Sequence, residues 1–466
     1  MNEQNSILAA ALRDAAVTRE VVVASGALAA LPRVARRCLG EARLLVVADD
    51  NTYGVAGSSV MEHLTQAGWS CAEPLILNET PRLKPRVQAA ERIAAHLRES
   101  GGTAIAVGSG VVNDLVKYAS ALAGRPYVCV ATAASMDGYA ASGAALLDGI
   151  FKTTMACAPP VAIVADLDVL TGAPARMASW GYGDLAGKVV AGADWSLADA
   201  LGVEAINPRP YAMVQDHLQT WLAQPHRLQE RDPDAFARLL SGLLVTGFAM
   251  QAHGNSRPAS GSDHQFSHLW EMENLSSDGE PAAHGACVGI GCVAMLALYE
   301  WLLAQPIGPA DIAQALTIRT DHDGLGREIA SSFARSELAD SARREMQAKR
   351  LAGDRADRLH RLGQQWPRLR ARLLQTLPAA ADMQRELRAA GAVAHPSELG
   401  VSLQKLAVDY RRARLIRRRY TLLDLVEDLG WLDRAIHALF AADGFWGRQS
   451  DLKVSAGREP AERVVH

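Results

Sequence analysis

One aspartate and two of three neighbouring histidines are the residues of this sequence best suited to hold a metal ion. His264 and His268 lie four residues apart, so on a helix they share one face, and His284 follows after a polar gap. Far upstream, Asp184 follows two glycines in the segment Trp180-Gly-Tyr-Gly-Asp184. One carboxylate and two imidazoles form an open ligand set on a divalent cation, with room for a substrate. Histidines at this spacing also occur as ordinary polar residues, so the spacing alone leaves both interpretations open.

A glycine turn is the second chemical signal. The apolar run 104–107 leads into Gly108-Ser109-Gly110, and a helical pattern follows. Backbone N–H groups at a helix N-terminus favour an anion, and glycines let a phosphate approach closely. Asn113 occupies the third glycine position of a GxGxxG pattern, so the match is incomplete. The segment predicts a nucleotide phosphate site, with an ordinary strand-to-helix turn as the alternative.

Hydroxyl and carboxylate groups follow the next expected strand, 127–130. They are Thr132, Ser135 and Asp137. Ligands of open α/β sheets bind at the carboxyl ends of strands, so these groups are placed to line a site. The alternative is that they only form a turn, which the same residue types favour.

Length and composition describe a globular protein with more than one core. At 466 residues the chain predicts two domains. A net charge of -3 gives no general attraction to nucleic acid or anionic membranes. The six cysteines form no CxxC pair, and Cys287, although near His284, is interpreted as a packing residue. With no signal-peptide pattern and no apolar run judged long enough to span a membrane, we expect a cytoplasmic protein.

Short apolar strands alternate with helical stretches in the first part of the chain. We therefore expect a Rossmann-like parallel-sheet domain over residues 21–172, with a hairpin-like pair at 144–155. From 173 to 446 helical periodicity dominates, including a helix from Asp184 to Leu201, so this part is expected to be all-helical. Residues 1–20 are expected to be an amphipathic helix or loose arm, and 447–466 a flexible tail.

A basic run extends from Arg411 to Arg419 in the last helical stretch. Nucleic-acid binding would need interleaved aromatic residues and basic surroundings, and both are missing. We interpret the run as a solvated helix face.

Four segments resemble glycerol-1-phosphate dehydrogenases, the bacterial branch in particular: TAASMDGYAA (132–141), GYGDLAGK (181–188), SGSDHQFSHLWEM (260–272) and ARLIRRRYTLLDLVEDLGWLD (413–433). That family is part of a superfamily with iron-type alcohol dehydrogenases and dehydroquinate synthase. The chain departs from the family pattern in its Gly108-Ser109-Gly110 turn, where the family has Gly-Gly-Gly-Ser. It also has Met136 in place of a histidine and Asp263 in place of a glutamate.

The resemblance implies an enzyme. It would interconvert dihydroxyacetone phosphate and sn-glycerol 1-phosphate with NAD, or possibly NADP, in a setting of phospholipid biosynthesis. Asp184, His264 and His284 would hold one Zn²⁺ or Ni²⁺ ion, which polarises the substrate carbonyl. The substrate would be a small phosphorylated ketone or alcohol, and a homodimer or higher homo-oligomer is expected.

Roles for other residues follow from the same resemblance. Lys188, one helical turn beyond Asp184, would receive the substrate phosphate together with His268, unless it is a surface lysine. Asp137 would hold a substrate hydroxyl or assist proton delivery, unless it only caps a turn. The residues expected around the cofactor are Asp49, Asp50, Gly108, Ser109, Gly110, Asp114, Thr132 and Ser135.

Other functions of the same fold stay open. A carboxylate at Asp49 or Asp50 would repel a ribose 2′-phosphate, so NAD is expected to be preferred over NADP. Dehydroquinate synthase would be expected to carry a glutamate as its first ligand, and Asp184 argues against it. The alternatives are a related polyol or alcohol dehydrogenase and a non-catalytic member of the fold.

Overall fold

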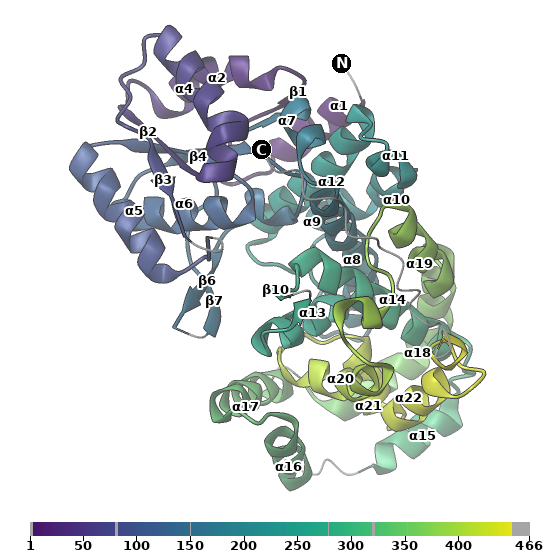
Figure 1. The fold of residues 1–466 in the computed structure, drawn as a ribbon. Helices are drawn as coiled ribbons and strands as arrows, with labels where there is room; N and C mark the ends of the chain where they lie inside the picture. The colour runs from purple at the N-terminus through teal and green to yellow at the C-terminus, as the bar shows by residue number, and fades with distance from the viewer. Residues whose placement is uncertain are drawn as a thin grey trace.

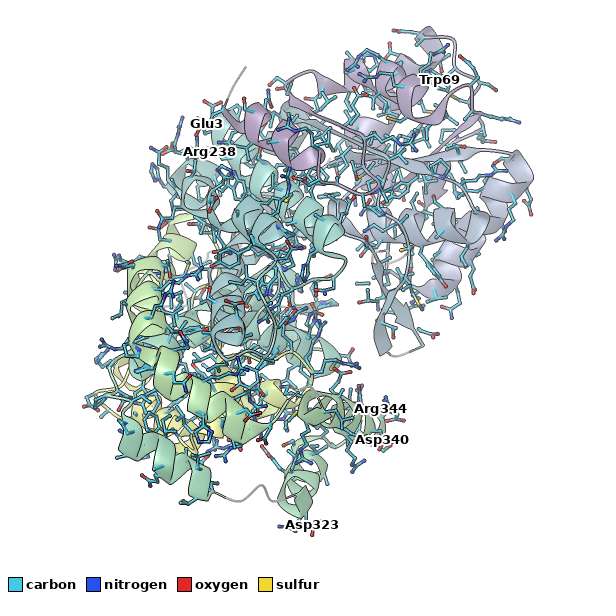
Figure 2. The ribbon with its side chains drawn as sticks, turned by 180° about the vertical axis from the view of Figure 1, so that it is seen from behind. Glu3, Trp69, Arg238, Asp323, Asp340 and Arg344 are labelled. Atoms are coloured by element: carbon cyan, nitrogen blue, oxygen red, sulfur yellow. The ribbon has the colours of Figure 1, made fainter. Side chains whose placement is uncertain are left out.

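A parallel sheet with helices on both faces forms one part of the molecule, and a larger assembly of helices forms the other (Figure 1). The computed structural model describes residues 3–79, 83–149, 151–277, 279–318, 322–351 and 353–449. Figure 2 shows the two parts from behind, with Trp69 toward the far end of the sheet part and Asp323 at the opposite end of the molecule. The expected fold class, a parallel-sheet domain followed by a helical domain, is confirmed.

The sheet has six parallel strands in the order β1-β8-β5-β4-β2-β3. Their bounds are β1 (Glu20–Ala24), β2 (Leu44–Asp49), β3 (Leu75–Leu77), β4 (Thr103–Gly108), β5 (Tyr127–Ala131) and β8 (Ala162–Asp166). The central strands are apolar at nearly every position, as expected where helices bury both faces. Gly108 is in register with Ala131, so β4 and β5 end side by side.

Alternate residues of the strands face two separate cores. Val46 and Ile105 pack with α2 (Leu31–Leu39) and α4 (Ser58–Gln66). Val47 and Ala106 pack on the other face with α5 (Val87–Ser100) and α6 (Gly110–Ala123). Shorter elements complete this part, namely η1 (Ala27–Ala30), α3 (Asp50–Thr52), η2 (Tyr53–Gly57), η3 (Asp137–Tyr139), the antiparallel hairpin β6 (Ala144–Asp148) and β7 (Phe151–Met155), and α7 (Leu167–Gly172). The hairpin prediction is therefore confirmed.

The second part is helical except for one two-residue strand pair. Its elements are α8 (Ala175–Ala200), α9 (Pro208–Gln215), α10 (Leu218–Leu222), α11 (His226–Gln229), α12 (Pro233–His253), α13 (Ser262–Met272), β9 (Ser276–Ser277), β10 (Glu280–Pro281), α14 (His284–Leu303), α15 (Pro309–Thr317), α16 (His322–Ser332), α17 (Ser336–Leu351), α18 (Arg355–Thr376), α19 (Ala380–Ala389), η4 (Pro396–Leu399), α20 (Leu403–Leu415), α21 (Leu422–Asp428), α22 (Leu432–Phe440) and η5 (Gly447–Gln449). The predicted division at residues 172 and 173 falls between α7 and α8.

Helix α8 begins at Ala175, so the predicted start at Asp184 was wrong. Gly181 and Gly183 lie inside the helix, where they allow close packing instead of ending it. A Cβ atom at Gly183 would lie 2.3 Å from the Gly285 carbonyl oxygen, and one at Gly285 would lie 1.8 Å from the Trp180 oxygen. The glycines let the backbones of α8 and α14 touch, which outweighs their low helix propensity.

Two helices of the described chain are long and apolar enough to cross a membrane, contrary to the expectation that no run is long enough. They are α12 and α14, and 89% of the apolar window of each is buried within the fold. Burial on all sides explains why they are apolar all round, as in core helices of large domains.

The N-terminal segment forms helix α1 (Glu3–Leu12), which packs against α12. Leu8 and Ala11 are buried, and the Trp221 indole N–H donates to the Gln4 side-chain oxygen at 3.1 Å. Of the two alternatives for this segment, the structure has the helix. Most of the tail predicted to be flexible, residues 450–466, lies outside the described residues.

Candidate metal and cofactor site

Three side chains from three different helices converge at the face of the helical part that lies toward the sheet. Asp184 is in α8, His264 is in the first turn of α13, and His284 begins α14. One ligand atom from each lies within 4.8 Å of the others. The structure therefore brings together the three residues predicted to share a divalent ion. That they bind one stays a prediction.

Each histidine of this cluster has a carboxylate behind it. The His264 Nδ1 lies 2.5 Å from an Asp263 oxygen, and the His284 Nδ1 lies 2.8 Å from a Glu271 oxygen. Such contacts fix the ring orientation and leave the Nε2 atoms for a cation, an arrangement common in metal sites. Burial opposes protonation of His264, but Asp263 outweighs it and raises the His264 pKa. The sequence analysis gave these two carboxylates no role, although both lie within a few residues of a histidine.

Lys188 and Asp137 complete the polar cluster around Asp184. The Lys188 ammonium lies 2.6 Å from an Asp184 oxygen and 2.8 Å from an Asp137 oxygen, and its side chain is fully buried. Asp184 also accepts from the Asp137 backbone N–H at 2.9 Å. Burial would raise the Asp184 pKa, but Lys188 above all lowers it; burial would lower the Lys188 pKa, but Asp137 and Asp184 raise it. Lys188 is not the surface residue of the alternative interpretation.

The phosphate role predicted for Lys188 gains little from this geometry. Two carboxylates surround a single ammonium group, which leaves the cluster with negative charge overall. Such a cluster attracts a cation. The Lys188 ammonium is already paired with both carboxylates, and its phosphate role stays a prediction. His268 lines the neighbouring pocket, but burial, and then Arg417, lower its pKa to about 3, so its ring is neutral at neutral pH.

Helix α13, which carries two of the histidines, is held at its C-terminal end by an ion-pair network. Glu273 accepts from Lys405 of α20 at 2.7 Å and also from Arg412. Lys405 and Arg412 bond in turn to the buried Asp409. Burial would raise the Glu273 pKa, but the hydrogen bonds from Lys405 and Arg412 outweigh it and lower that pKa.

Replacing Glu273 with glutamine is therefore expected to reduce the free energy of unfolding by about 1–3 kcal/mol at pH 7. Because the folded-state pKa is lowered, this contribution is present above the ordinary pKa of a glutamate. It is lost as the pH falls through the lowered value. Denaturant unfolding of wild type and Glu273→Gln between pH 7 and 3 should show the difference shrinking with acid. The exposed Glu337→Gln substitution in α17 is the control and should show no comparable difference at any pH.

The glycine turn lies next to Met136, in the segment that also contacts the metal cluster. β4 ends at Gly108 and α6 begins at Gly110, as the sequence predicted. The Met136 side chain lies against the turn, 2.7 Å from where a Gly110 Cβ would be, and 2.8 Å from where a Gly138 Cβ would be. Asp137, the next residue, bonds to Asp184. The glycine turn and the metal ligands therefore border the same region.

Other residues predicted to bind the cofactor lie around this edge of the sheet. Thr132 and Ser135 are buried in the segment after β5, and the Thr132 N–H donates to the Gly108 carbonyl at 3.2 Å. Asp49 ends β2, the strand next to β4, and its side chain caps the following turn by accepting from the Thr52 N–H at 2.8 Å. Asp50 is exposed beside it.

Asp114 and Lys117 make hydrogen bonds to other segments of the protein. An Asp114 oxygen accepts from the Ala145 N–H of the hairpin at 3.3 Å, and its role at the cofactor stays a prediction. The buried Lys117 ammonium donates to the carbonyls of Gly138, Ala141 and Gly143 at 2.8–3.0 Å. Lys117 thus holds the loop that carries Asp137. The sequence analysis missed it, because a lysine in a helix carries no signal of burial.

A pocket of about 590 Å³ opens beside the cluster. Asp137, His264, His268 and His284 line one side of it. The residues that line the rest include Asn255, Ser256, Ser260 and Arg417, none of which was predicted to be functional. The candidate metal cluster thus lies near the glycine turn and beside a cavity of the size of a small-molecule site.

Comparisons with known proteins agree with this architecture. A model of the iron-containing alcohol dehydrogenase family matches residues 22–174. The crystal structure of glycerol dehydrogenase from Schizosaccharomyces pombe superposes with a TM-score of 0.59 at 14% identity, covering 94% of this chain and 92% of that one. Sulfoacetaldehyde reductase from Bifidobacterium kashiwanohense, solved in complex with NAD+, gives a TM-score of 0.54 at 14% identity, covering 92% and 98%. The fold is that of the iron-containing alcohol dehydrogenases.

Sequence relatives narrow the class. Glycerol-1-phosphate dehydrogenase [NAD(P)+] of Bacillus subtilis is 30% identical over 387 residues, 83% of this chain and 85% of the relative. The enzyme of the same name from Pyrococcus furiosus is 29% identical, covering 68% of this chain and 96% of the relative. The chain belongs to the glycerol-1-phosphate dehydrogenase family, as the resemblance of its four segments indicated.

Proposed function

We propose that the protein interconverts dihydroxyacetone phosphate and sn-glycerol 1-phosphate with a nicotinamide cofactor and one divalent metal ion. The observation that carries the proposal is the convergence of Asp184, His264 and His284 beside the glycine turn, in a chain of this family. Cytoplasmic location and homo-oligomeric assembly stay expectations.

The residues present fit a metal ion. One carboxylate and two imidazoles whose Nδ1 atoms are already bonded to carboxylates leave the Nε2 atoms and one aspartate oxygen for the ion. This donor set suits Zn²⁺ and Ni²⁺ alike. A bound ion would supply a Lewis acid for the oxygen of the ketone.

The residues also fit a dinucleotide. The N-terminus of α6 and the glycine turn offer backbone N–H groups to a pyrophosphate, and a Cβ at Gly108 would lie 2.5 Å from Val112, so the turn needs glycine. Asp49 ends the adjacent strand, where its carboxylate would accept from ribose hydroxyls. The cofactor would supply the hydride.

The chain itself would handle the proton. Asp137 lines the pocket and is bonded to the Lys188 ammonium, which spans Asp137 and Asp184. We propose that Asp137 holds a substrate hydroxyl or passes a proton to the substrate oxygen, and that Lys188 keeps the two carboxylates at a fixed separation.

NADH oxidation in the presence of dihydroxyacetone phosphate tests the proposal. The metal-loaded protein should consume NADH, chelation should stop the reaction, and added Zn²⁺ or Ni²⁺ should restore it. In the reverse direction, glycerol 1-phosphate should be oxidised far better than glycerol. Better use of glycerol would favour a polyol dehydrogenase, and no oxidation of NADH with any ketose phosphate by the metal-loaded protein would favour a non-catalytic member.

NADH is expected to be used with a kcat/KM about 10-fold or more above that of NADPH. The reason is repulsion between the Asp49 carboxylate and a 2′-phosphate, where 1.4 kcal/mol corresponds to tenfold. Asp49→Ser keeps a side chain able to cap the turn and removes the charge, so it should narrow the preference. Equal or better use of NADPH by the wild type would contradict the prediction.

A further inference from the structure

One wall of the pocket carries a positively charged side chain, Arg417, which lies near His268. The interpretation of Arg411 to Arg419 as a solvated face was wrong, because α20 ends at Leu415 and the chain then turns inward. Arg414 is buried, and Arg417 and Arg419 are partly buried. Arg417 lines the pocket that also contains His264 and His284.

Arg419 makes hydrogen bonds to the segment that forms this wall of the pocket. It donates to the carbonyls of Ser256 and Ser260 and, at 3.2 Å, to the Ser256 hydroxyl. Burial and then its neighbours Arg257 and Arg417 lower the Arg419 pKa to about 9, which leaves it charged at neutral pH. The positive charges of Arg257 and Arg417 therefore act on Arg419, while Glu204 and Asp194 oppose them.

Arg417 has unused hydrogen-bonding capacity. Its guanidinium makes no hydrogen bond or ion pair with any of the described residues. The carboxylates of Glu271 and Glu345 act on it only through longer-range electrostatics. Glu271 is bonded to His284, and Glu345 is paired with the neighbouring Arg418. Five fixed N–H donors beside a cavity suit an oxyanion.

Two polar side chains lie on the same wall. The Asn255 side-chain oxygen accepts from the Arg257 backbone N–H at 2.8 Å. The oxygen is therefore engaged within the protein, and the NH₂ group of the same side chain is left to act as a donor. Ser256 accepts from Arg419 and keeps its own O–H to donate. Arginine, amide and hydroxyl donors are the groups that bind a phosphate.

We propose that Arg417, with Asn255 and Ser256, forms the subsite for the phosphate of the substrate. This inference rests on the proposed function and names the residues that would distinguish a phosphorylated ketone from an uncharged one. The phosphate lies at the arginine wall, and the carbonyl end of the substrate lies toward His264 and His284, in the same pocket. The subsite takes the place of the one predicted at Lys188 and His268.

Kinetics of Arg417→Met, Arg417→Lys and the control Arg418→Met test the subsite. Arg418 is the neighbouring residue, with a side chain 65% exposed and paired with Glu345. For Arg417→Met, the ratio of kcat/KM for dihydroxyacetone phosphate to that for dihydroxyacetone should fall on the order of 100-fold, mainly through KM. Arg417→Lys should recover part of the loss. Arg418→Met should keep the wild-type ratio.

Direct binding separates failure of the subsite from failure of the proposed function. Inorganic phosphate should raise the Tm of the metal-loaded wild type and of Arg418→Met, and should not raise that of Arg417→Met. This readout holds even if dihydroxyacetone phosphate is not turned over. An unchanged substrate ratio or an equal phosphate-induced Tm shift in Arg417→Met would overturn the subsite, as would an equal effect of Arg418→Met.

Discussion

Alanine in place of His264 is expected to remove the bound divalent ion and to lower kcat/KM by about 10³-fold or more. The variant loses one of three protein ligands, and the remaining pair, Asp184 and His284, comes from two helices that converge on an ion only together with α13. Metal content measured by mass spectrometry and NADH oxidation measured on the same samples should fall together. His360→Ala, at an exposed position of α18, should keep both.

The Asp263 carboxylate, which contacts the His264 ring, allows a milder substitution to test the same metal site. Asp263→Asn keeps the shape of the side chain and weakens the hold on the imidazole Nδ1. Metal affinity should fall 10- to 100-fold, less than in His264→Ala, and excess metal should restore activity. A His264→Ala variant that keeps both its metal and its activity would exclude the proposed centre.

Methionine in place of Lys188 is expected to destabilise the metal-free protein by about 3–5 kcal/mol and to abolish most activity. The variant leaves the buried carboxylates of Asp184 and Asp137 without their shared ammonium. Denaturant unfolding of chelated samples measures the loss. Adding Asp137→Asn in the Lys188→Met background should recover part of the stability, because one of the two uncompensated charges is removed.

The activity of the Lys188→Met variant tests whether Lys188 acts only by holding Asp137 and Asp184 at a fixed separation. If that is its only role, the affinity for the metal ion and the rate of turnover should fall together. A Lys188→Met protein that unfolds within 1 kcal/mol of wild type would show that the ion pairs contribute little to the fold.

The sheet was predictable because its sequence signal is local. The runs 44–48 and 104–107 are apolar at every position, which is typical of a strand buried on both faces. Asp49 ends the first run and Gly108 ends the second. The convergence of Asp184, His264 and His284 was predictable for a different reason. Histidine and aspartate in these segments resemble a known family, and the family fixes their arrangement.

What could not be predicted depends on contacts between distant segments. The helix was predicted to begin at Asp184, but Gly181 and Gly183 lie inside it, where Ala134 and Gly285 approach the backbone closely. Arg417 stood in a basic run typical of a solvated surface, and only the packing of α20 against α13 brings it to the pocket. Length and hydropathy likewise did not distinguish α12 and α14 from membrane spans, because burial within the fold produces the same composition.

The direct backbone contact between α8 and α14 restricts how this enzyme can change. Where the Trp180 carbonyl meets Gly285, no side chain separates the two helices, so a side chain added at Gly285 would displace the neighbouring His284, a proposed metal ligand. Another wall of the cavity, which includes Asn255, Ser256 and Arg417, consists of side chains that can be exchanged one at a time. New substrate preferences, whether they arise by drift or in a directed-evolution library, should therefore come from that wall.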